Sequence, residues 1–359
     1  MCCFGVWNPE YNENFKIEYD DSPYGESLTR GFDKLKEAEL LILFNAKFDL
    51  NHYRRYGFNY WDKKIWDCQL AHFILTNQTH PYPSLNDVAA YYGLESKIDK
   101  IAEYWDNGVQ TTDIPYNELD EYLTQDLKLT YQIYLKQLEH LEREPHKKRL
   151  ISLSMQDTIV LADIEWNGLK YDFKLSKEKA EALRSKIETL DVQIKSLFDI
   201  EGINWNSNDH LSAVLYGGVL KIPVREKTER VLKDGSIKYG ERWGEKLITM
   251  ERLVNPLPRT ECAKEGYWKT GEDILRSLKA RGKAKKLIEL VLERSVLDKE
   301  LNTYADGLPK FYEEMHYTDE IINGRFNQTV ARTGRLSSSQ PNLQNISGAI
   351  KECFRSRYD

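Results

Sequence analysis

A change in hydrophobic period near residue 145 constrains the fold of this chain more than any other feature. From about residue 37 to 142, short apolar runs alternate with helical patterns. Residues 38–44 read as a buried strand, and a helix is expected to begin near Asp49. From Pro145 to about Leu197 the apolar spacing becomes helical, and Asn167-Gly168 ends the first helix with a good C-terminal stop. These patterns predict an α/β domain followed by a mainly α-helical one.

The stretch from about residue 219 to 269 interrupts the helical region. It is rich in Lys, Glu, Gly and Pro, and residues 233–236 favour a turn, so we expect a hairpin or an extended insertion. A capping pattern at Thr270 then starts a long helical region that runs to about Asp306. Because a chain of 359 residues exceeds one ordinary core, two or three domains are expected.

Composition excludes several classes of protein. Apolar content of 41% is enough for packed cores. No run approaches ~18 consecutive apolar residues, and the N-terminus lacks a signal-peptide layout, so we expect a cytoplasmic protein with no membrane partner. The five cysteines include no C-x-x-C pair, which argues against structural zinc. A net charge of −6 argues mildly against binding of nucleic acid. The local charge is the better guide, because a protein can bind nucleic acid through one face.

Two acidic residues stand where α/β sites are usually built. Asp49 follows the predicted strand and would lie at the carboxyl end of a sheet. Asp126 and Tyr122 lie four residues apart, on one face of a predicted helix. Carboxylates that hold Mg²⁺, with a group that orients water, suit two-metal phosphodiester hydrolysis. The alternative is that Asp49 is a helix N-cap and Asp126 a solvated surface residue.

The run of residues 324–346 combines arginines with many hydroxyl and amide side chains. Arg325, Arg332 and Arg335 could contact phosphates, while the small polar groups could contact sugars and minor-groove acceptors. A polar surface loop is the alternative on composition alone. A second basic run, residues 276–286, is by default a solvated helix face, and its alternative role is to follow the phosphate backbone.

Residues 333–346 resemble the signature that precedes motif A in family A DNA polymerases, the DNA polymerase I family. Residues 163–172 resemble the entry to the thumb of the same family. Residues 45–49 and 66–71, together with Tyr122-x-x-x-Asp126, resemble in order and spacing the second and third motifs of the family's 3′–5′ exonuclease domain.

The resemblance implies a DNA-directed DNA polymerase with a proofreading exonuclease, which binds primer–template DNA and single-stranded 3′ ends. It implies a ribonuclease H-like α/β exonuclease domain at 1–142, a mainly helical thumb at 143–320 with an insertion at about 219–269, and the start of the palm at 321–359. Asp49 and Asp126 would bind Mg²⁺, Tyr122 would orient the attacking water, and Asp67 would be structural. The DNA-binding residues implied are Asn45, Lys47, Arg332, Thr333, Arg335, Ser337, Asn342, Gln344 and Asn345.

Two departures from the family pattern qualify these expectations. The first exonuclease motif, Asp-x-Glu, should precede a segment like residues 3–7, where this chain begins, and Glu18-Tyr19-Asp20 has the residue types in reverse order. The catalytic carboxylates of the palm should lie beyond Asp359, which does not have the sequence context of the motif A aspartate. We therefore expect polymerisation to require a palm and fingers from a second chain or a longer product. The compact layout resembles bacteriophage polymerases, which would place the protein in the host cytoplasm.

Two alternatives stay open. One is a catalytically silent DNA-binding or assembly subunit of a split polymerase. The other is a free-standing exonuclease whose missing ligands come from Glu18 or Asp20.

Overall fold

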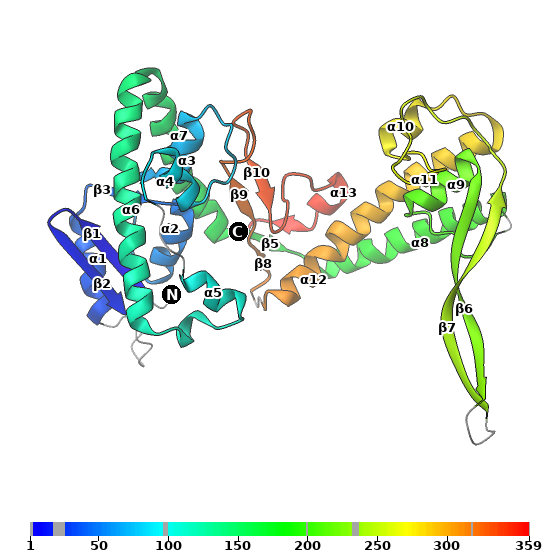
Figure 1. Ribbon diagram of the computed structural model, residues 1–359, viewed down its shortest axis with the longest axis horizontal. Helices are drawn as coiled ribbons and strands as arrows, with labels where there is room; N and C mark the ends of the chain where they lie inside the picture. Colours follow the sequence, from blue (N-terminus) through cyan, green and yellow to red (C-terminus); the bar gives the residue numbers. More distant parts are fainter. Residues whose placement is uncertain are drawn as a thin grey trace. The chain divides into compact units, whose positions relative to one another are not determined.

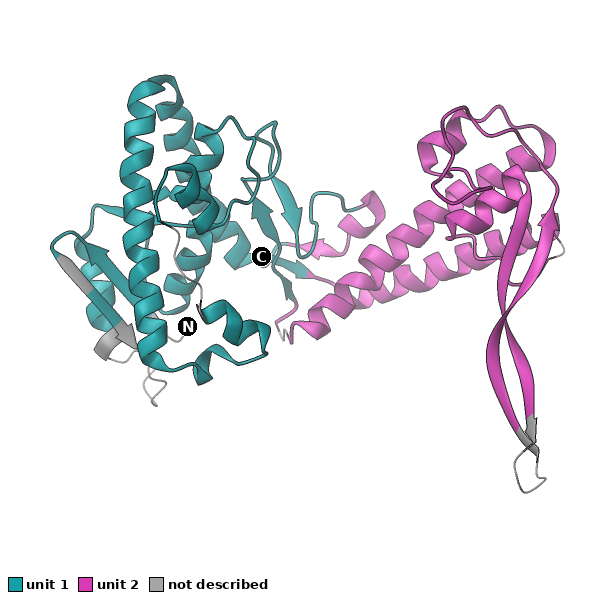
Figure 2. Cartoon of the chain, viewed as in Figure 1, with its two compact units in different colours: residues 1–170, 321–346, 356–359 teal, residues 171–320, 347–355 magenta. Residues whose placement is uncertain are grey.

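The computed structural model describes residues 3–16, 26–95, 100–198, 200–231, 237–316 and 319–358. The chain divides into two compact units (Figure 2). Unit 1 contains residues 1–170, 321–346 and 356–359, and unit 2 contains residues 171–320 and 347–355. Within the described ranges, no helix combines the length and the apolar composition needed to cross a membrane.

Unit 1 mixes helices with short strands (Figure 1). Its strands are β1 (Cys3–Asn8), β2 (Tyr11–Lys16), β3 (Leu40–Leu43), β4 (Lys64–Asp67), most of β5 (Leu169–Tyr171), β8 (Ile321–Ile322), β9 (Arg325–Asn327) and β10 (Ser337–Ser339). Its helices are α1 (Glu26–Glu37), α2 (Ala46–Arg55), α3 (Cys68–Leu75), α4 (Leu85–Tyr91), α5 (Lys100–Asp106), α6 (Tyr116–Arg143) and α7 (Lys148–Asn167), with 3₁₀ turns η1 (Thr111–Asp113) and η2 (Pro145–Lys147).

Strands β3 and β4 are parallel, and α2 lies between them in the chain. This β-α-β unit confirms the predicted strand but corrects the start of the helix, which begins at Ala46 and not near Asp49. The reason is local: Asn45 adopts a left-handed conformation with φ of 60° and acts as the N-cap. A residue of this type tolerates that conformation better than most, so the chain turns from strand to helix within two residues.

The boundary after unit 1 differs from the predicted one at residue 142. Helix α7 buries Ile151 and Met155 in the same core as Leu41, Leu50 and Ile65 of the β-α-β unit. Because α7 shares this apolar core, it belongs to the N-terminal unit. It ends at Asn167 with Gly168 at φ of 57°, which confirms the predicted stop.

Strands β1 and β2 form an antiparallel hairpin that packs on α6. The contact is close at Gly5, where a Cβ atom would lie 2.5 Å from Leu127 Cδ1. Among the described residues, β1–β2 and β3–β4 are separate two-stranded sheets. The α/β character of this region is therefore confirmed, while the ribonuclease H-like assignment stays a prediction.

Unit 2 contains long helices and one long β-ribbon (Figure 1). Its helices are α8 (Phe173–Leu197), α9 (Asn208–Tyr216), α10 (Glu272–Ser277), α11 (Gly282–Glu300), α12 (Gly307–Glu314) and α13 (Gly348–Lys351), with a π-helical turn η3 (Leu301–Ala305). Its strands are β6 (Gly218–Val231), β7 (Ile237–Met250) and the short β11 (Phe354–Arg355).

The core of unit 2 lies between α8 and α11. Ile194 of α8 packs with Leu287 and Val291 of α11, and an ion pair of 2.6 Å joins Asp191 to Arg294 on the same two helices. This arrangement agrees with the predicted helical domain.

The predicted insertion is an antiparallel ribbon in which Gly218 pairs with Met250 and Val231 with Ile237. Leu220 and Ile222 bury its base against α9. The hairpin prediction is confirmed, although regular pairing ends at Met250 and the predicted turn at 233–236 lies outside the described residues.

Two local predictions in unit 2 need correction. The N-cap of α10 is Gly271, and the Thr270 hydroxyl bonds the Asn208 side chain instead, at 3.0 Å. The basic run at 276–286 does not lie on one helix face, because α10 ends at Ser277 and α11 begins at Gly282.

Candidate acidic cavity and arginine-bearing hairpin

The structure brings Asp49, Tyr122 and Asp126 together at one cavity in unit 1. The cavity has a volume of about 1120 Å³, and residues of β1 and β3 also line it. Tyr122 and Asp126 come from one face of α6, as their spacing predicted. Asp49 comes from the first turn of α2, so two segments separated by more than sixty residues supply the acidic groups.

The environment of Asp49 favours its protonated form. The side chain is partly buried, and this burial raises its pKa from 3.8 to about 7, with the negative charge of Asp67 adding to the rise. A carboxyl group in such a place would gain most from a bound cation, which restores the charged form. The alternative in which Asp49 caps the helix is wrong, because Asn45 occupies that position.

Asp67 is buried and holds the backbone around it. Its carboxylate accepts hydrogen bonds from the amides of Asn45 at 3.1 Å, Ala46 at 2.8 Å, Gln69 at 2.9 Å and Leu70 at 3.3 Å. Burial raises the pKa of Asp67, and these four amides oppose the rise. The carboxylate thereby joins the start of α2 to the start of α3, which confirms the structural role expected for it.

Helix α6 is fixed against the β-α-β unit by a buried amide. The Gln137 side chain accepts from Trp66 Nε1 at 2.8 Å and donates to the Cys68 carbonyl at 2.7 Å. Nearer the cavity, Asn14 Nδ2 donates to Thr124 Oγ1 at 2.6 Å. These bonds set the rotation of α6, and so the direction in which Tyr122 and Asp126 face.

The described residues do not by themselves complete a two-metal site. Among them, no group of three or more His, Cys, Asp or Glu side chains is placed to hold a metal ion. The cavity offers Asp49 and Asp126, whereas two Mg²⁺ ions require more oxygen ligands. Glu18 and Asp20, considered as substitutes, lie outside the described residues.

The second candidate site is the antiparallel hairpin of β9 and β10 with the segment that follows, residues 325–345. Phe326 pairs with Ser338 across the hairpin, and Asn327 Nδ2 donates to Ser339 Oγ at 3.1 Å. Ser337 is half-buried. The predicted DNA-binding side chains that are exposed here are Arg332, Thr333, Arg335, Asn342, Gln344 and Asn345.

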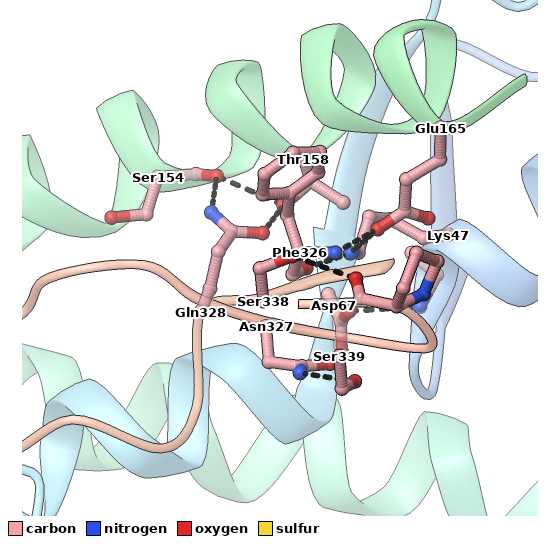
Figure 3. A network of polar contacts seen from close by, with 12 residues as sticks. Lys47, Asp67, Ser154, Thr158, Glu165, Phe326, Asn327, Gln328, Ser338 and Ser339 are labelled. Atoms are coloured by element: carbon pink, nitrogen blue, oxygen red, sulfur yellow. Dashed lines mark hydrogen bonds and ion pairs between the residues drawn. The ribbon is translucent and has the colours of Figure 1, made fainter. Parts of the chain in front are cut away.

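The hairpin is held by side chains of α7 and α2 (Figure 3). Glu165 accepts from the Phe326 amide at 2.6 Å and forms an ion pair with Lys47, whose ammonium also donates to the Phe326 carbonyl. Lys47 is thus engaged within the protein, which disfavours its predicted contact with DNA. Asn45 is exposed and remains available for the predicted contact.

A second set of polar contacts lies beside this one. Gln328 donates to the Ser154 carbonyl at 3.1 Å and accepts from the Thr158 hydroxyl at 2.9 Å (Figure 3). The sequence predicted a helix over this stretch, but it did not predict a role for Thr158 or Glu165. The sequence does contain an indication of this contact. Glu165 follows the buried residues Thr158 and Leu161 by seven and four positions, so it lies on the same side of the helix, where an acid requires a partner.

The C-terminal part of the chain matches a known protein family. Residues 242–358, which include the hairpin, match the model of DNA polymerase family A. The relatives named below are all bacterial, and the predicted bacteriophage type stays a prediction.

The chain is similar to DNA polymerase I from several bacteria. It is 26% identical over 354 residues to DNA polymerase I of Synechocystis sp., an alignment that covers 95% of this chain and 31% of that protein. It is 32% identical over 187 residues to the thermostable DNA polymerase I of Thermus filiformis, covering 52% of this chain and 17% of that protein. The chain thus spans less than a third of the length of these relatives.

A solved structure shares the fold. It is the POL domain of Pol1 from M. smegmatis in complex with DNA primer-template and dNTP, with a TM-score of 0.65 and 19% identity. The match covers 98% of this chain and 51% of that chain. The family model and the relatives thus show a similarity to family A DNA polymerases of the DNA polymerase I type, and the solved structure shows a shared fold.

Proposed function

We propose that this chain is the part of a DNA-directed DNA polymerase that binds primer–template DNA, through residues 325–345. The observation that carries the proposal is the exposure of Arg332 and Arg335 beside Asn342, Gln344 and Asn345. The match to DNA polymerase family A includes this segment, and a protein of similar fold has been solved with DNA primer-template.

The chemistry of the segment suits a duplex of any sequence. Exposed guanidinium groups neutralise phosphates and release their counterions, which makes binding depend on salt. Amide side chains can donate to the minor-groove acceptors that all base pairs present. The segment lacks the geometry of a helix or ribbon that enters the major groove, because β9 and β10 contain three residues each.

Binding of a fluorescent primer–template, measured by anisotropy, tests this proposal. Arg335→Ala should weaken binding about tenfold, and to a similar extent for unrelated DNA sequences. Arg55→Ala, which removes an exposed arginine on α2, is the matched control and should bind like the unchanged protein. Equal affinity of the two variants would contradict the proposal.

We also propose that residues 1–142 contribute part of a 3′–5′ exonuclease site that acts on single-stranded 3′ ends. The specific observation in favour is that Asp49, Tyr122 and Asp126 line one cavity. Mg²⁺ would be the cofactor, and its remaining ligands would come from outside the described residues. In this site Asp49 and Asp126 would bind the cation, and the Tyr122 hydroxyl would align a water molecule.

Degradation of a 3′-labelled single strand with Mg²⁺ tests the second proposal. Activity that disappears in both Asp49→Ala and Asp126→Ala supports it, and Asp106→Ala, at an exposed acid outside the cavity, is the control. Absence of cleavage by the unchanged protein, with DNA binding retained, would favour the alternative of a catalytically silent DNA-binding subunit.

A further inference from the structure

Both backbone polar groups of Phe326 are bound by charged side chains. Its amide donates to Glu165 Oε1 at 2.6 Å, and its carbonyl accepts from Lys47 Nζ. In an antiparallel pair, alternate residues turn their N–H and C=O groups away from the partner strand. Phe326 therefore presents these groups on the outer edge of β9, and the ion pair fills the place that a third strand would take.

The ion pair itself is largely removed from water. The Lys47 side chain is 14% exposed and the Glu165 side chain 9% exposed. Charges in such a place are stable only when they are paired and hydrogen-bonded. Because each of the two charges also binds Phe326, the loss of either one would leave a buried charge and an unsatisfied backbone group.

The pair connects three elements of unit 1. Glu165 belongs to α7, Lys47 to α2, and Phe326 to β9. The loop between β9 and β10 carries Arg332 and Arg335, so the position of both arginines depends on how β9 is held. Lys47 also stands two residues before Asp49, so the same carboxylate of Glu165 holds the helix of the acidic cavity.

We propose that Glu165 and Lys47 are positioning residues that fix the β9–β10 hairpin on α2 and α7, and thereby present Arg332 and Arg335 to DNA. The second half of this statement rests on the proposed function, whereas the first half does not. Their effect on DNA binding would be indirect, because both side chains are occupied by each other and by Phe326.

The chain contains a matched control. Arg54 and Asp163 form an ion pair between the same two helices, α2 and α7, with side chains 28% and 27% exposed. The other hydrogen bond of Asp163 goes to Asn167, which also lies on α7, so this pair joins the helices without contacting the hairpin. A purely structural role in helix packing would affect both pairs alike.

Hydrogen exchange of the protein without DNA tests the first half. In Glu165→Ala the protection of the amides of residues 325–329 should fall by about tenfold more than that of peptides in α6, which report the general loss of stability. Asp163→Ala should leave residues 325–329 within about twofold of the unchanged protein. Glu165→Gln, which keeps an oxygen for the Phe326 amide, should restore much of the protection, and it also serves if Glu165→Ala does not fold. Unchanged exchange in both Glu165 variants would overturn the proposal, as would equal effects of Glu165→Ala and Asp163→Ala.

Primer–template binding tests the second half. Glu165→Ala should lower the affinity about tenfold while the dependence of affinity on salt keeps its slope, because no phosphate contact is removed. Asp163→Ala should bind normally. If the unchanged protein does not bind DNA, the proposed function fails and the presentation of the arginines fails with it, while hydrogen exchange still decides whether the pair fixes the hairpin. Normal binding by Glu165→Ala, with faster exchange, would overturn the second half alone.

Discussion

The acidic cavity and the hairpin of unit 1 use charged groups in opposite ways. In the cavity, burial raises the pKa of Asp49 to about 7, which favours the protonated, uncharged carboxyl group. At the hairpin, Lys47 and Glu165 are also buried, but each neutralises the other, while Arg332 and Arg335 stay exposed. An acid whose pKa is raised by burial and by a second acid can respond to a cation or to pH, whereas a buried ion pair holds structure.

The largest effect expected from this difference is on stability at the hairpin. Glu165→Ala should lower the free energy of unfolding by about 3–5 kcal/mol, because it leaves Lys47 buried without its counter-charge. Asp163→Ala, in the more exposed pair between the same helices, should cost about 1 kcal/mol or less. Urea unfolding of both variants measures the two values. Similar losses would show that burial of the first pair has no energetic consequence.

A smaller effect of opposite sign is expected in the cavity. The folded-state pKa of Asp49, about 7, lies above the ordinary value of 3.8. Its contribution to stability is therefore most favourable below about pH 4, falls as the pH rises, and is least favourable above about pH 7. Asp49→Asn mimics the protonated form, so at pH 8 in EDTA it should stabilise the protein by about 1–4 kcal/mol.

The same variant should have little effect on stability near pH 3, where the carboxyl group is mainly protonated in both states. Thermal unfolding across this pH range measures the difference between variant and unchanged protein. Asp106→Asn, at an exposed acid, is the control. A difference that does not depend on pH would show that the cavity leaves Asp49 charged.

Local signals predicted the elements of this fold well, because each depended on neighbours in the chain. The stop at Gly168 and the ribbon after Gly217 are of this kind. The grouping of Asp49 with Asp126 required more, since it came from a family resemblance and not from spacing. Once that resemblance placed both residues, the cavity followed from the β-α-β unit and one long helix.

Contacts between distant residues account for what the sequence did not predict. Helix α2 begins at Ala46, where Asp67, 21 residues further along the chain, binds the amide. Thr270 does not cap α10, and its hydroxyl bonds Asn208, 62 residues away. The pairing of Lys47 with Glu165 spans 118 residues. The sequence can show that a residue near a helix end, or a charged residue on the buried side of a helix, needs a partner. Which residue becomes that partner is decided only in the folded chain.

The smallest effect on stability is expected at the exposed end of the hairpin. Arg332→Ala should change the free energy of unfolding by less than about 0.5 kcal/mol, because the side chain is exposed and buries little surface. If Arg332 contacts a phosphate as proposed, the same variant should reduce the salt dependence of primer–template binding by about one charge. Glu165→Ala should show the reverse pattern, with a large loss of stability and an unchanged salt slope. Anisotropy titrations at several salt concentrations, with urea unfolding of the same samples, separate the two patterns. A large stability loss in Arg332→Ala would mean that the arginines of the hairpin stabilise the fold. The proposed difference between the buried Lys47–Glu165 pair and the exposed arginines would then be wrong.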